Sequence, residues 1–408
     1  MKFITSLILC TELIVVALAQ VKVQNANVEP DLVIPNSYII KYKPDASVIK
    51  KKKHEKVINE KAKNKGKEGV VNNIDIDGFK GYIAEIPSSE LKEIIESDLV
   101  ESIEKDTIVS VSGVAAPLTK RKFATQSNAP WGLARISETY KPGGLGTRYT
   151  YDTTAGAGKT VYVLDSGIRT SHKEFEGRAI WGTNFVNGSS KTDEFGHGTH
   201  VAGTIGGKTY GVAKGCTMIA VKVLDKDGLG TMSGIIQGLQ WAVDDAKSRG
   251  ITKKAVINAS LGGLYEQAAN EAVKVATKLG ITFVAAAGNF GDDAAYYSPA
   301  SASSAITVGS IDGVGYRNSW SNYGAVVDIF APGSDILSAD HLTDSSSVYR
   351  SGTSMAAPHV AGLAAYFMAK EGLRGSTAVT NRIIAAAGPG VIGAMGSPDR
   401  IVYNGGSK

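Results

Sequence analysis

The residues best suited to chemistry in this chain begin with one serine. Ser354 follows a Gly-Thr turn and opens a run of small apolar residues that predicts a tightly packed helix. A serine at a helix start lies at the positive end of the helix dipole, where backbone N–H groups can stabilise an oxyanion. Because a hydroxyl is a weak nucleophile at neutral pH, this serine needs a base elsewhere in the chain.

A histidine and an aspartate could supply the missing groups. His197 stands in a glycine-rich turn before a second tightly packed helix, and Asp165 ends an apolar strand. A neutral imidazole can take the serine proton near neutral pH, and a carboxylate on its other nitrogen fixes the tautomer and stabilises the imidazolium. Each residue alone is more often structural. Together, in the order Asp, His, Ser, they predict a nucleophilic triad.

These three motifs resemble those of the subtilisin-like serine proteases (subtilases), most closely the proteinase K group. The order Asp, His, Ser is that of subtilisin, whereas chymotrypsin and the α/β-hydrolases use other orders. The resemblance runs from about Ala124 to the end and includes residues 128–137, 260–263 and 321–324. It implies a secreted serine endopeptidase of broad specificity that acts on polypeptides through an acyl-enzyme and is made as a self-processed zymogen.

The resemblance also assigns residues around the triad. Asn289 matches the oxyanion asparagine of the family, and an extended peptide would add as a strand between two cleft edges. Small apolar walls predict large apolar or aromatic side chains before the scissile bond. Leu229 and Met232 depart from the usual rim residues, so the preference further upstream stays open. The edges and walls comprise Gly228, Leu229, Gly230, Ser260, Leu261, Gly262, Ala286, Ala287 and Gly288.

A structural calcium ion is a further expectation from the resemblance. Asp328 matches a calcium-binding aspartate of the proteinase K group, and the carbonyls of Ser303 and Ala305 would complete the site. One carboxylate with backbone oxygens suits a hard cation such as Ca²⁺. Ser303 replaces a proline of the family. The second, weaker site is not expected, because residues 388–390 lack its aspartate.

Other histidines, another hydrolase fold and an inactive relative are the alternatives to an active triad of Asp165, His197 and Ser354. His200 and His359 lie within five residues of a triad member, but structural hydrogen bonding is the better interpretation of both. An α/β-hydrolase needs Gly-x-Ser-x-Gly with the histidine last, and here Ala356 ends the motif. An inactive subtilase that serves as a binding protein is disfavoured, because all triad and oxyanion residues are present.

Alternating strands and helices must position these residues. The pattern predicts an α/β fold, a doubly wound and mostly parallel sheet with helices on both faces. Asp165, Ser260 and Asn289 fall at or just past strand ends, where sites in such sheets belong. The predicted strands span residues 161–165, 217–224, 255–261 and 281–287, and the predicted helices span 231–250 and 265–279.

A smaller α+β domain is expected to precede this sheet. Residues 37–107 resemble the inhibitor propeptide of subtilases, a split βαβ (ferredoxin-like) fold that would serve as intramolecular inhibitor and chaperone. A free-standing binding module is the alternative. The predicted strands span residues 37–42, 70–76, 79–86 and 100–104, the last one short, and the predicted helices span 51–65 and 88–97.

Residues 108–123 read as a processing linker, and 124–408 as the catalytic domain. Cleavage after Phe123 would leave Ala124 as the new N-terminus, and the pair Lys120-Arg121 offers a second cut. Residues 1–19 resemble a signal peptide with a cleavage site after Ala19, which predicts secretion to the exterior or, alternatively, delivery to a vacuole or lysosome-like compartment.

Composition limits the remaining possibilities. The 408 residues carry a net charge of +5, and the lysine-rich stretch 50–67 fits a solvated helix face better than a nucleic-acid site. No segment after the signal is apolar enough to span a membrane. Cys216 is the only cysteine left, which predicts a buried thiol and no intramolecular disulfide. We expect a monomer, glycosylated at Asn187 but not at the sequon of Asn258.

Overall fold

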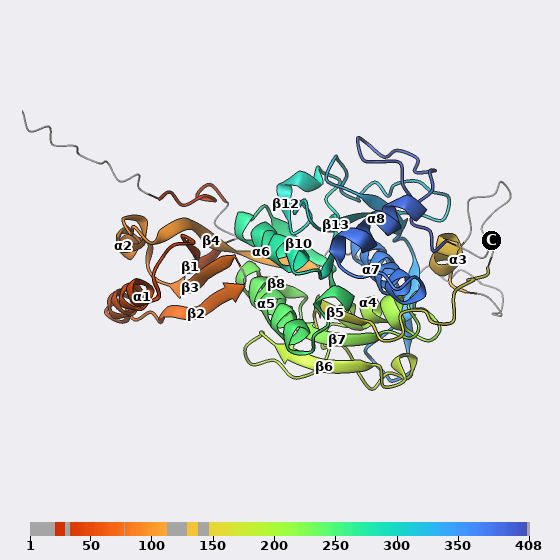
Figure 1. Cartoon of the computed structure of the whole chain (residues 1–408), viewed down its shortest axis with the longest axis horizontal. Helices are drawn as coiled ribbons and strands as arrows, with labels where there is room; N and C mark the ends of the chain where they lie inside the picture. Colours follow the sequence, from red (N-terminus) through yellow and green to blue (C-terminus); the bar gives the residue numbers. More distant parts are fainter. Residues whose placement is uncertain (1–20, 29–32, 77, 112–128, 138–146, 406–408) are drawn as a thin grey trace, which may run out of the picture.

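The chain folds into a small N-terminal domain attached to a larger α/β domain (Figure 1). The computed structural model describes residues 21–28, 33–76, 78–111, 129–137 and 147–405. Among these residues, no helix is long and apolar enough to cross a membrane. Both predicted domain types are confirmed.

The N-terminal domain is a four-stranded antiparallel sheet with two helices. Its strand order is β4-β1-β3-β2, so the chain runs as a split βαβ fold, as expected. The second helix is shorter than predicted, because a 3₁₀ turn over Ser88–Glu90 precedes it. The elements are β1 (Val33–Tyr42), α1 (Val48–Lys63), β2 (Gly69–Ile76), β3 (Phe79–Glu85), α2 (Lys92–Ile95) and β4 (Val100–Val111).

The larger domain is built on a seven-stranded parallel sheet of order β14-β13-β11-β9-β5-β7-β6. Its central strands are almost continuously apolar, because both faces of a parallel sheet are covered. The bounds are β5 (Thr160–Asp165), β6 (Ala179–Asn184), β7 (Thr217–Lys222), β9 (Ala255–Ala259), β11 (Thr282–Ala286), β13 (Ile306–Ile311) and β14 (Ile329–Pro332).

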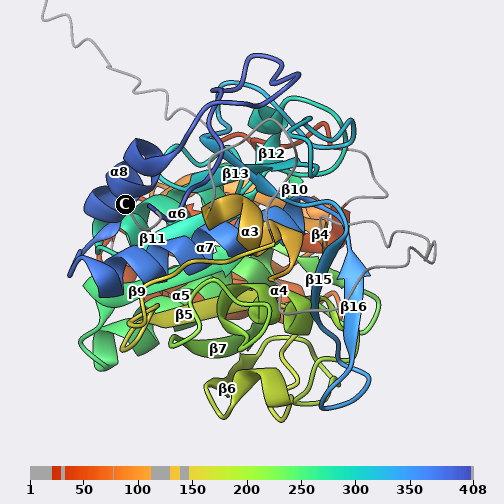
Figure 2. The same cartoon turned by 90° about the vertical axis from the view of Figure 1, so that its right-hand side faces the viewer.

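Helices pack on both faces of this sheet, as predicted. Val161 and Val163 of β5 belong to one core cluster, and Tyr162 and Leu164 belong to the other. The first cluster lies under α3 (Trp131–Ser137), α4 (His197–Gly206), α7 (Thr353–Lys370) and α8 (Ser376–Ala386), which face the viewer in Figure 2. The second lies under α5 (Met232–Ser248) and α6 (Gln267–Lys278).

The small residues of α7 have a packing role. A Cβ added to Gly362 would lie 2.7 Å from Val212 Cβ and 3.1 Å from the carbonyl oxygen of Ile205, the penultimate residue of α4. The two helices can therefore approach closely only if such positions stay small. This approach brings the first residues of α4 and α7, which carry the predicted histidine and serine, to the same end of the sheet.

Strand β4 is longer than the sequence indicated. It was expected to stop at Glu104, with a linker from Ile108, but it continues to Val111. Its second half pairs antiparallel with β8 (Leu229–Thr231) on one side and β10 (Leu261–Leu264) on the other. The expectation was wrong because the hydrogen-bonding partners of Ile108–Val111 belong to the other domain, which local propensity does not reveal. β10 also pairs with β12 (Tyr297–Ser298), and β15 (Ile336–Ala339) pairs with β16 (Ser347–Arg350).

Candidate active site

Asp165 and His197 form a buried pair at the carboxyl edge of the parallel sheet. Asp165 is the last residue of β5, and His197 is the first residue of α4. His197 Nδ1 lies 2.8 Å from Asp165 Oδ1, and both side chains are almost completely buried. An ionised carboxylate can only accept, so Nδ1 carries the proton and Nε2 is left as the acceptor of the neutral ring.

Ser354 lies in the first turn of α7, which packs against α4. Its Oγ donates to the carbonyl oxygen of Ser260 at 2.9 Å, and Ser260 Oγ donates back to the carbonyl oxygen of Ser354 at 2.9 Å. His197 Nε2 is buried and has no hydrogen-bond partner among the described residues. The helix starts thus place a hydroxyl and an unused basic nitrogen on neighbouring elements.

Asn289 is tied directly to the start of α7. Its Oδ1 accepts hydrogen bonds from the backbone N–H and the hydroxyl of Thr353, both at 2.9 Å. These bonds fix the orientation of the amide. Its Nδ2 is buried and has no partner in the described part of the chain. The amide is thus held beside Thr353, the residue before Ser354. An oriented, unused N–H donor in this place is suited to stabilise a developing oxyanion.

Asn322 holds the Asn289 loop, a role that sequence reasoning missed. Asn322 Nδ2 donates to the Ala287 carbonyl at 2.9 Å, and Oδ1 accepts from the N–H of Phe290 at 2.9 Å and of Asp292 at 3.2 Å. Gly288 has φ +105°, and an added Cβ would lie 2.4 Å from Asn322 Nδ2. The only sequence signal was the segment 321–324, which was noted for its resemblance without a role.

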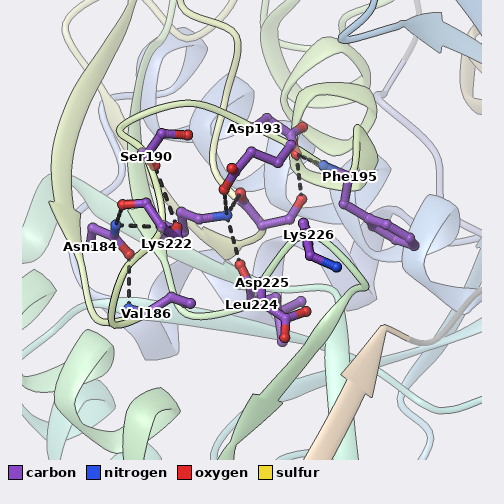
Figure 3. A network of polar contacts seen from close by, with 12 residues as sticks. Asn184, Val186, Ser190, Asp193, Phe195, Lys222, Leu224, Asp225 and Lys226 are labelled. Atoms are coloured by element: carbon purple, nitrogen blue, oxygen red, sulfur yellow. Dashed lines mark hydrogen bonds and ion pairs between the residues drawn. The ribbon is translucent and has the colours of Figure 1, made fainter.

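Asp193 organises the backbone around the histidine and was also missed (Figure 3). Its Oδ1 accepts from Ser166 Oγ at 2.8 Å and from the N–H of Gly196 at 2.7 Å, and its Oδ2 accepts from the N–H and hydroxyl of Thr199 at 2.8 and 2.6 Å. Ser166 in turn donates its backbone N–H to Asp165 Oδ1 at 2.8 Å. Asp193 therefore connects the start of α4 to the end of β5.

A buried cation lies in the same network. Lys222 Nζ donates to the carbonyls of Ser166 at 2.6 Å and Leu224 at 2.9 Å, and it lies 3.7 Å from Glu194 Oε2. Its side chain is fully buried. Burial lowers the pKa of Lys222, and the carboxylates of Asp193 and its neighbours oppose this shift. In the sequence, Lys222 lies inside the predicted apolar strand 217–224, and no role was predicted for it.

The two predicted cleft edges enclose a strand of the chain itself. Val109 lies opposite Gly230, and Ser110 lies between Leu229 and Gly262. Val111 then lies opposite Leu261, so the chain runs toward Ser260, whose carbonyl contacts Ser354. The backbone geometry is that of an added strand.

The predicted walls of the primary pocket lie beside these edges. Ala286 ends β11, and both Ala286 and Ala287 are buried, as are Ser260 and Leu261. On the rim, Leu229 is 46% exposed whereas Met232 is buried. Of the two unusual rim residues, only Leu229 is therefore accessible from outside.

The two histidines that were alternatives to His197 have structural hydrogen bonds, as predicted. His200 Nε2 lies 2.9 Å from the Ile336 carbonyl, and burial lowers the pKa of His200 to about 3. His359 Nδ1 lies 2.8 Å from the Met355 carbonyl within α7, and burial lowers the pKa of His359 to about 4. Both rings stay neutral at neutral pH and use their N–H groups to brace the backbone.

The donor set expected for calcium is only partly organised by side chains. Asp328 Oδ2 accepts from the backbone N–H of Thr307 at 2.8 Å, which places the carboxylate two residues beyond Ala305. Ser303 is exposed on the same turn. Within the described ranges, no three His, Cys, Asp or Glu side chains gather into a metal site. One carboxylate with nearby backbone carbonyls fits a hard cation such as Ca²⁺, and does not fit a transition metal.

The remaining predicted positions are also placed. Asn187 lies in an exposed turn, whereas Asn258 is completely buried in β9 and bonds Ser260 Oγ at 2.9 Å. Cys216 is a buried free thiol, as predicted, and burial raises its pKa to about 12. The processing residues Phe123 and Ala124, the pair Lys120-Arg121 and residues 1–19 lie outside the described residues.

Comparisons with known proteins agree with this geometry. The Subtilase family model matches residues 156–399, and the Peptidase inhibitor I9 model matches residues 37–112. The chain is 45% identical over 414 residues to Subtilisin-like protease 1 of Pseudogymnoascus destructans, which covers 99% of both chains. It is 53% identical over 282 residues to Alkaline protease 1 of Aspergillus clavatus, which covers 69% of each.

A solved structure gives the same result for the larger domain. The crystal structure of a cold adapted subtilisin-like serine proteinase superposes with a TM-score of 0.64 at 41% identity, and covers 68% of this chain and 99% of that one. The N-terminal domain is thus the inhibitor propeptide of a zymogen, and the larger domain is the peptidase. The chain belongs to the subtilase family and is a subtilisin-like serine protease that is preceded by an I9 inhibitor domain.

Proposed function

We propose that this protease is a secreted endopeptidase of broad specificity that uses Asp165, His197 and Ser354 as its triad. The observation that carries the proposal is a buried, oriented His197–Asp165 pair whose Nε2 has no partner among the described residues. The unpaired Nδ2 of Asn289, held next to the start of α7, supports it further. Buried polar atoms without partners are rare. During the reaction, the Ser354 hydroxyl would supply the partner of His197 Nε2, and the substrate oxygen would supply the partner of Asn289 Nδ2.

The mechanism follows from these positions. His197 Nε2 takes the proton of Ser354 Oγ as the oxygen attacks the substrate carbonyl, and Asp165 stabilises the imidazolium that forms. Asn289 Nδ2 and the backbone at the start of α7 stabilise the oxyanion. His197 then protonates the leaving amine, which gives an acyl-enzyme on Ser354. Water, activated by the same imidazole, hydrolyses the acyl-enzyme and restores the serine.

Substrate recognition rests mainly on the main chain. The edges β8 and β10 hydrogen-bond an extended strand, and such bonds do not depend on side-chain identity. The walls at Ser260, Leu261, Ala286 and Ala287 are small or apolar and favour a large apolar or aromatic residue before the scissile bond. At the rim, the exposed Leu229 would contact upstream residues.

Self-processing is supported by the course of β4. Val111, the last described residue of β4, lies opposite Leu261, which directly follows Ser260 in the chain. We therefore propose that the first cut falls close behind Val111, upstream of Phe123. A second cut, after Phe123 or at Lys120-Arg121, would then be needed to leave Ala124 at or near the mature N-terminus. The released domain remains an inhibitor for as long as it stays bound.

Three further assignments belong to the same proposal. Calcium bound by Asp328 with the carbonyls of Ser303 and Ala305 would stabilise the turn before β13. Asn187 is the glycosylation site, since its turn is exposed. The enzyme acts as a monomer outside the cell. The resemblance of residues 1–19 to a signal peptide supports an extracellular destination.

The decisive experiment compares wild-type protein with Ser354→Ala. We expect a fluorophosphonate to label the processed wild type on Ser354, and we expect the variant to remain an unprocessed precursor, with kcat reduced by about 10⁶ as in subtilisin. Sequencing the new N-termini of the wild type locates each cut. Labelling of the variant, or normal processing of the variant without another protease, would refute the assignment of the nucleophile.

A further inference from the structure

Three carboxyl groups are buried where the inhibitor domain meets the protease. Glu104 and Asp106 belong to β4, and Glu266 directly precedes α6; none is more than 2% exposed. Acidic side chains are almost never fully buried unless they are paired with cations or with hydrogen-bond donors. How each of these oxygens is satisfied therefore decides its protonation state.

Asp106 has donors for both of its oxygens, and these hydrogen bonds oppose the burial that raises its pKa. It accepts from the backbone N–H of Ser233 at 3.1 Å and from Ser233 Oγ at 2.5 Å, at the start of α5. Ser37 Oγ adds a third bond at 3.0 Å. The inhibitor domain thus caps a helix of the protease with this residue, and a negative charge is favourable at that helix end.

Only one oxygen of Glu104 and one oxygen of Glu266 accept a hydrogen bond from a donor among the described residues. Glu104 Oε2 accepts from the N–H of Ala268 at 3.4 Å, and Glu266 Oε1 accepts from Thr107 Oγ1 at 2.7 Å and Asn25 Nδ2 at 3.1 Å. Glu104 Oε1 and Glu266 Oε2 are buried without any donor from the described residues. Carboxylates only accept, so one proton shared between the two carboxyl groups would satisfy both of these oxygens.

Within the part of the chain that the structure describes, no neighbouring cation neutralises this pair. Lys41 is bonded to Glu101 and Glu271, and Lys105 Nζ donates to the Ala26 carbonyl at 2.7 Å. The adjoining elements α5 and β12 contribute the uncharged Ser233 and Ser298. Burial, the interaction with Glu104 and the charge of Asp106 raise the pKa of Glu266 to about 10.

We propose that Glu104 and Glu266 form a proton-binding site that ties the affinity between the inhibitor domain and the protease to pH. The site exists only in the complex, because Glu104 leaves with the inhibitor domain and Glu266 stays behind. Once the two domains separate, Glu266 would titrate in the ordinary glutamate range near pH 4.3. The proposal requires the two-domain arrangement alone and does not depend on Ser354 or on self-cleavage.

The sign of the effect follows from linkage. Because the pKa of Glu266 is raised in the complex, the stabilisation is complete below the ordinary glutamate range and is lost as pH rises toward about 10. In this interval the complex holds one more proton than its separated parts, so the dissociation constant rises by up to about tenfold per pH unit. An acidic environment keeps the protease inhibited, and a neutral or alkaline one releases it.

The test uses the full chain with Ser354→Ala, so that no activity interferes. A recognition sequence for an unrelated protease, inserted between residues 113 and 123, allows the linker to be cut in the folded protein. Dissociation of the two parts is then measured by dilution and gel filtration from about pH 5.5 to about pH 8.5. We expect the dissociation constant to rise by at least about 30-fold over this interval, within the limit of about tenfold per unit.

Glu266→Gln separates this role from simple packing. Its amide can donate to Glu104 Oε1 without a proton while still accepting from Thr107, so the rise should fall below about fivefold. At about pH 8.5 the variant should bind at least about tenfold more tightly than wild type, a gain that loss of packing cannot produce. The matched control Glu271→Gln lies on α6, the helix that Glu266 precedes; it loses an ion pair with Lys41 of β1 and should weaken binding with the wild-type pH slope. A wild-type rise below about threefold, or a full wild-type slope in Glu266→Gln, would overturn the proposal.

Discussion

Lys222 lies close to the triad but touches no predicted substrate position. Its ammonium holds the carbonyl of Ser166, the residue directly after Asp165, and Ser166 itself donates to the Asp165 carboxylate. A buried cation among Asp193, Glu194 and Asp165 balances a local excess of negative charge. We therefore regard Lys222, which Figure 3 shows near Asp193 and Leu224, as a positioning residue that keeps the Asp165 carboxylate aimed at His197.

Replacement by an apolar side chain of similar length tests this role. In Lys222→Met the carbonyls of Ser166 and Leu224 lose their donor, and we expect kcat/KM to fall by about 10- to 100-fold, mainly through kcat. Removal of a positive charge near the imidazole should also move the acid limb of the pH profile of kcat/KM to higher pH. Steady-state kinetics between about pH 5 and pH 9 would show both effects.

Lys226→Met is the matched control. Lys226 lies in the loop that follows β7, four residues after Lys222. It is exposed and pairs only with Asp227 among the described residues, so kinetics and stability should stay close to wild type. If Lys222→Met merely lowered the melting temperature and left kcat and the pH profile unchanged, its role would be structural and not one of positioning.

Helix α4 illustrates how an element delivers a catalytic group. Its N-cap, Gly196, has no side chain, and Asp193 accepts the N–H groups of Gly196 and Thr199 in its place. These are among the donors that have no partner within a helix. The position of His197, the first residue of the helix, therefore depends on a carboxylate that precedes the helix.

Asp193→Asn should disturb this start without changing the side-chain volume. One of the two acceptor oxygens becomes an NH₂ group that faces backbone N–H donors, and the charge that favours the helix N-terminus is lost. We expect a loss of about 1–3 kcal/mol in the free energy of unfolding, together with a lower kcat. Thermal unfolding and kinetics measure the two effects. Asp227→Asn, at an exposed position, is the control, and an equal loss there would contradict the capping role.

At the scale of the whole molecule, stability should depend on a bound cation. If Ca²⁺ binds at Asp328, saturation at about 100-fold over its dissociation constant adds about 2.7 kcal/mol, which for a domain of this size is about 4–5 °C in melting temperature. EDTA should remove this increment, and Asp328→Asn should abolish the response to EDTA. An unchanged melting temperature of the processed wild type in EDTA would rule out the site.

The sheet that continues from one domain into the other shows why the contacts of the inhibited state could not be predicted from the sequence. Residues 108–111 have no pattern that distinguishes a linker from a strand, and their partners lie more than 100 residues away in β8 and β10. Likewise, the contact between Thr107 and Glu266 spans 159 positions. No periodicity or spacing in the sequence reports which acidic side chains will meet across such a distance.

What the sequence determined by itself was the chemistry and the fold class. Short motifs of small residues surround Asp165, His197, Ser354 and Asn289, so the candidate site could be predicted locally. The strands of the parallel sheet are continuous apolar runs, so the sheet could be predicted locally as well. Only the tertiary structure decided the supporting shell: Asp193, Lys222 and Asn322 around the site, the length of β4, and the pairing of Glu104 with Glu266. These depend on burial and on partners distant in the chain, because hydrogen bonds and desolvation act only once the chain has brought the groups together.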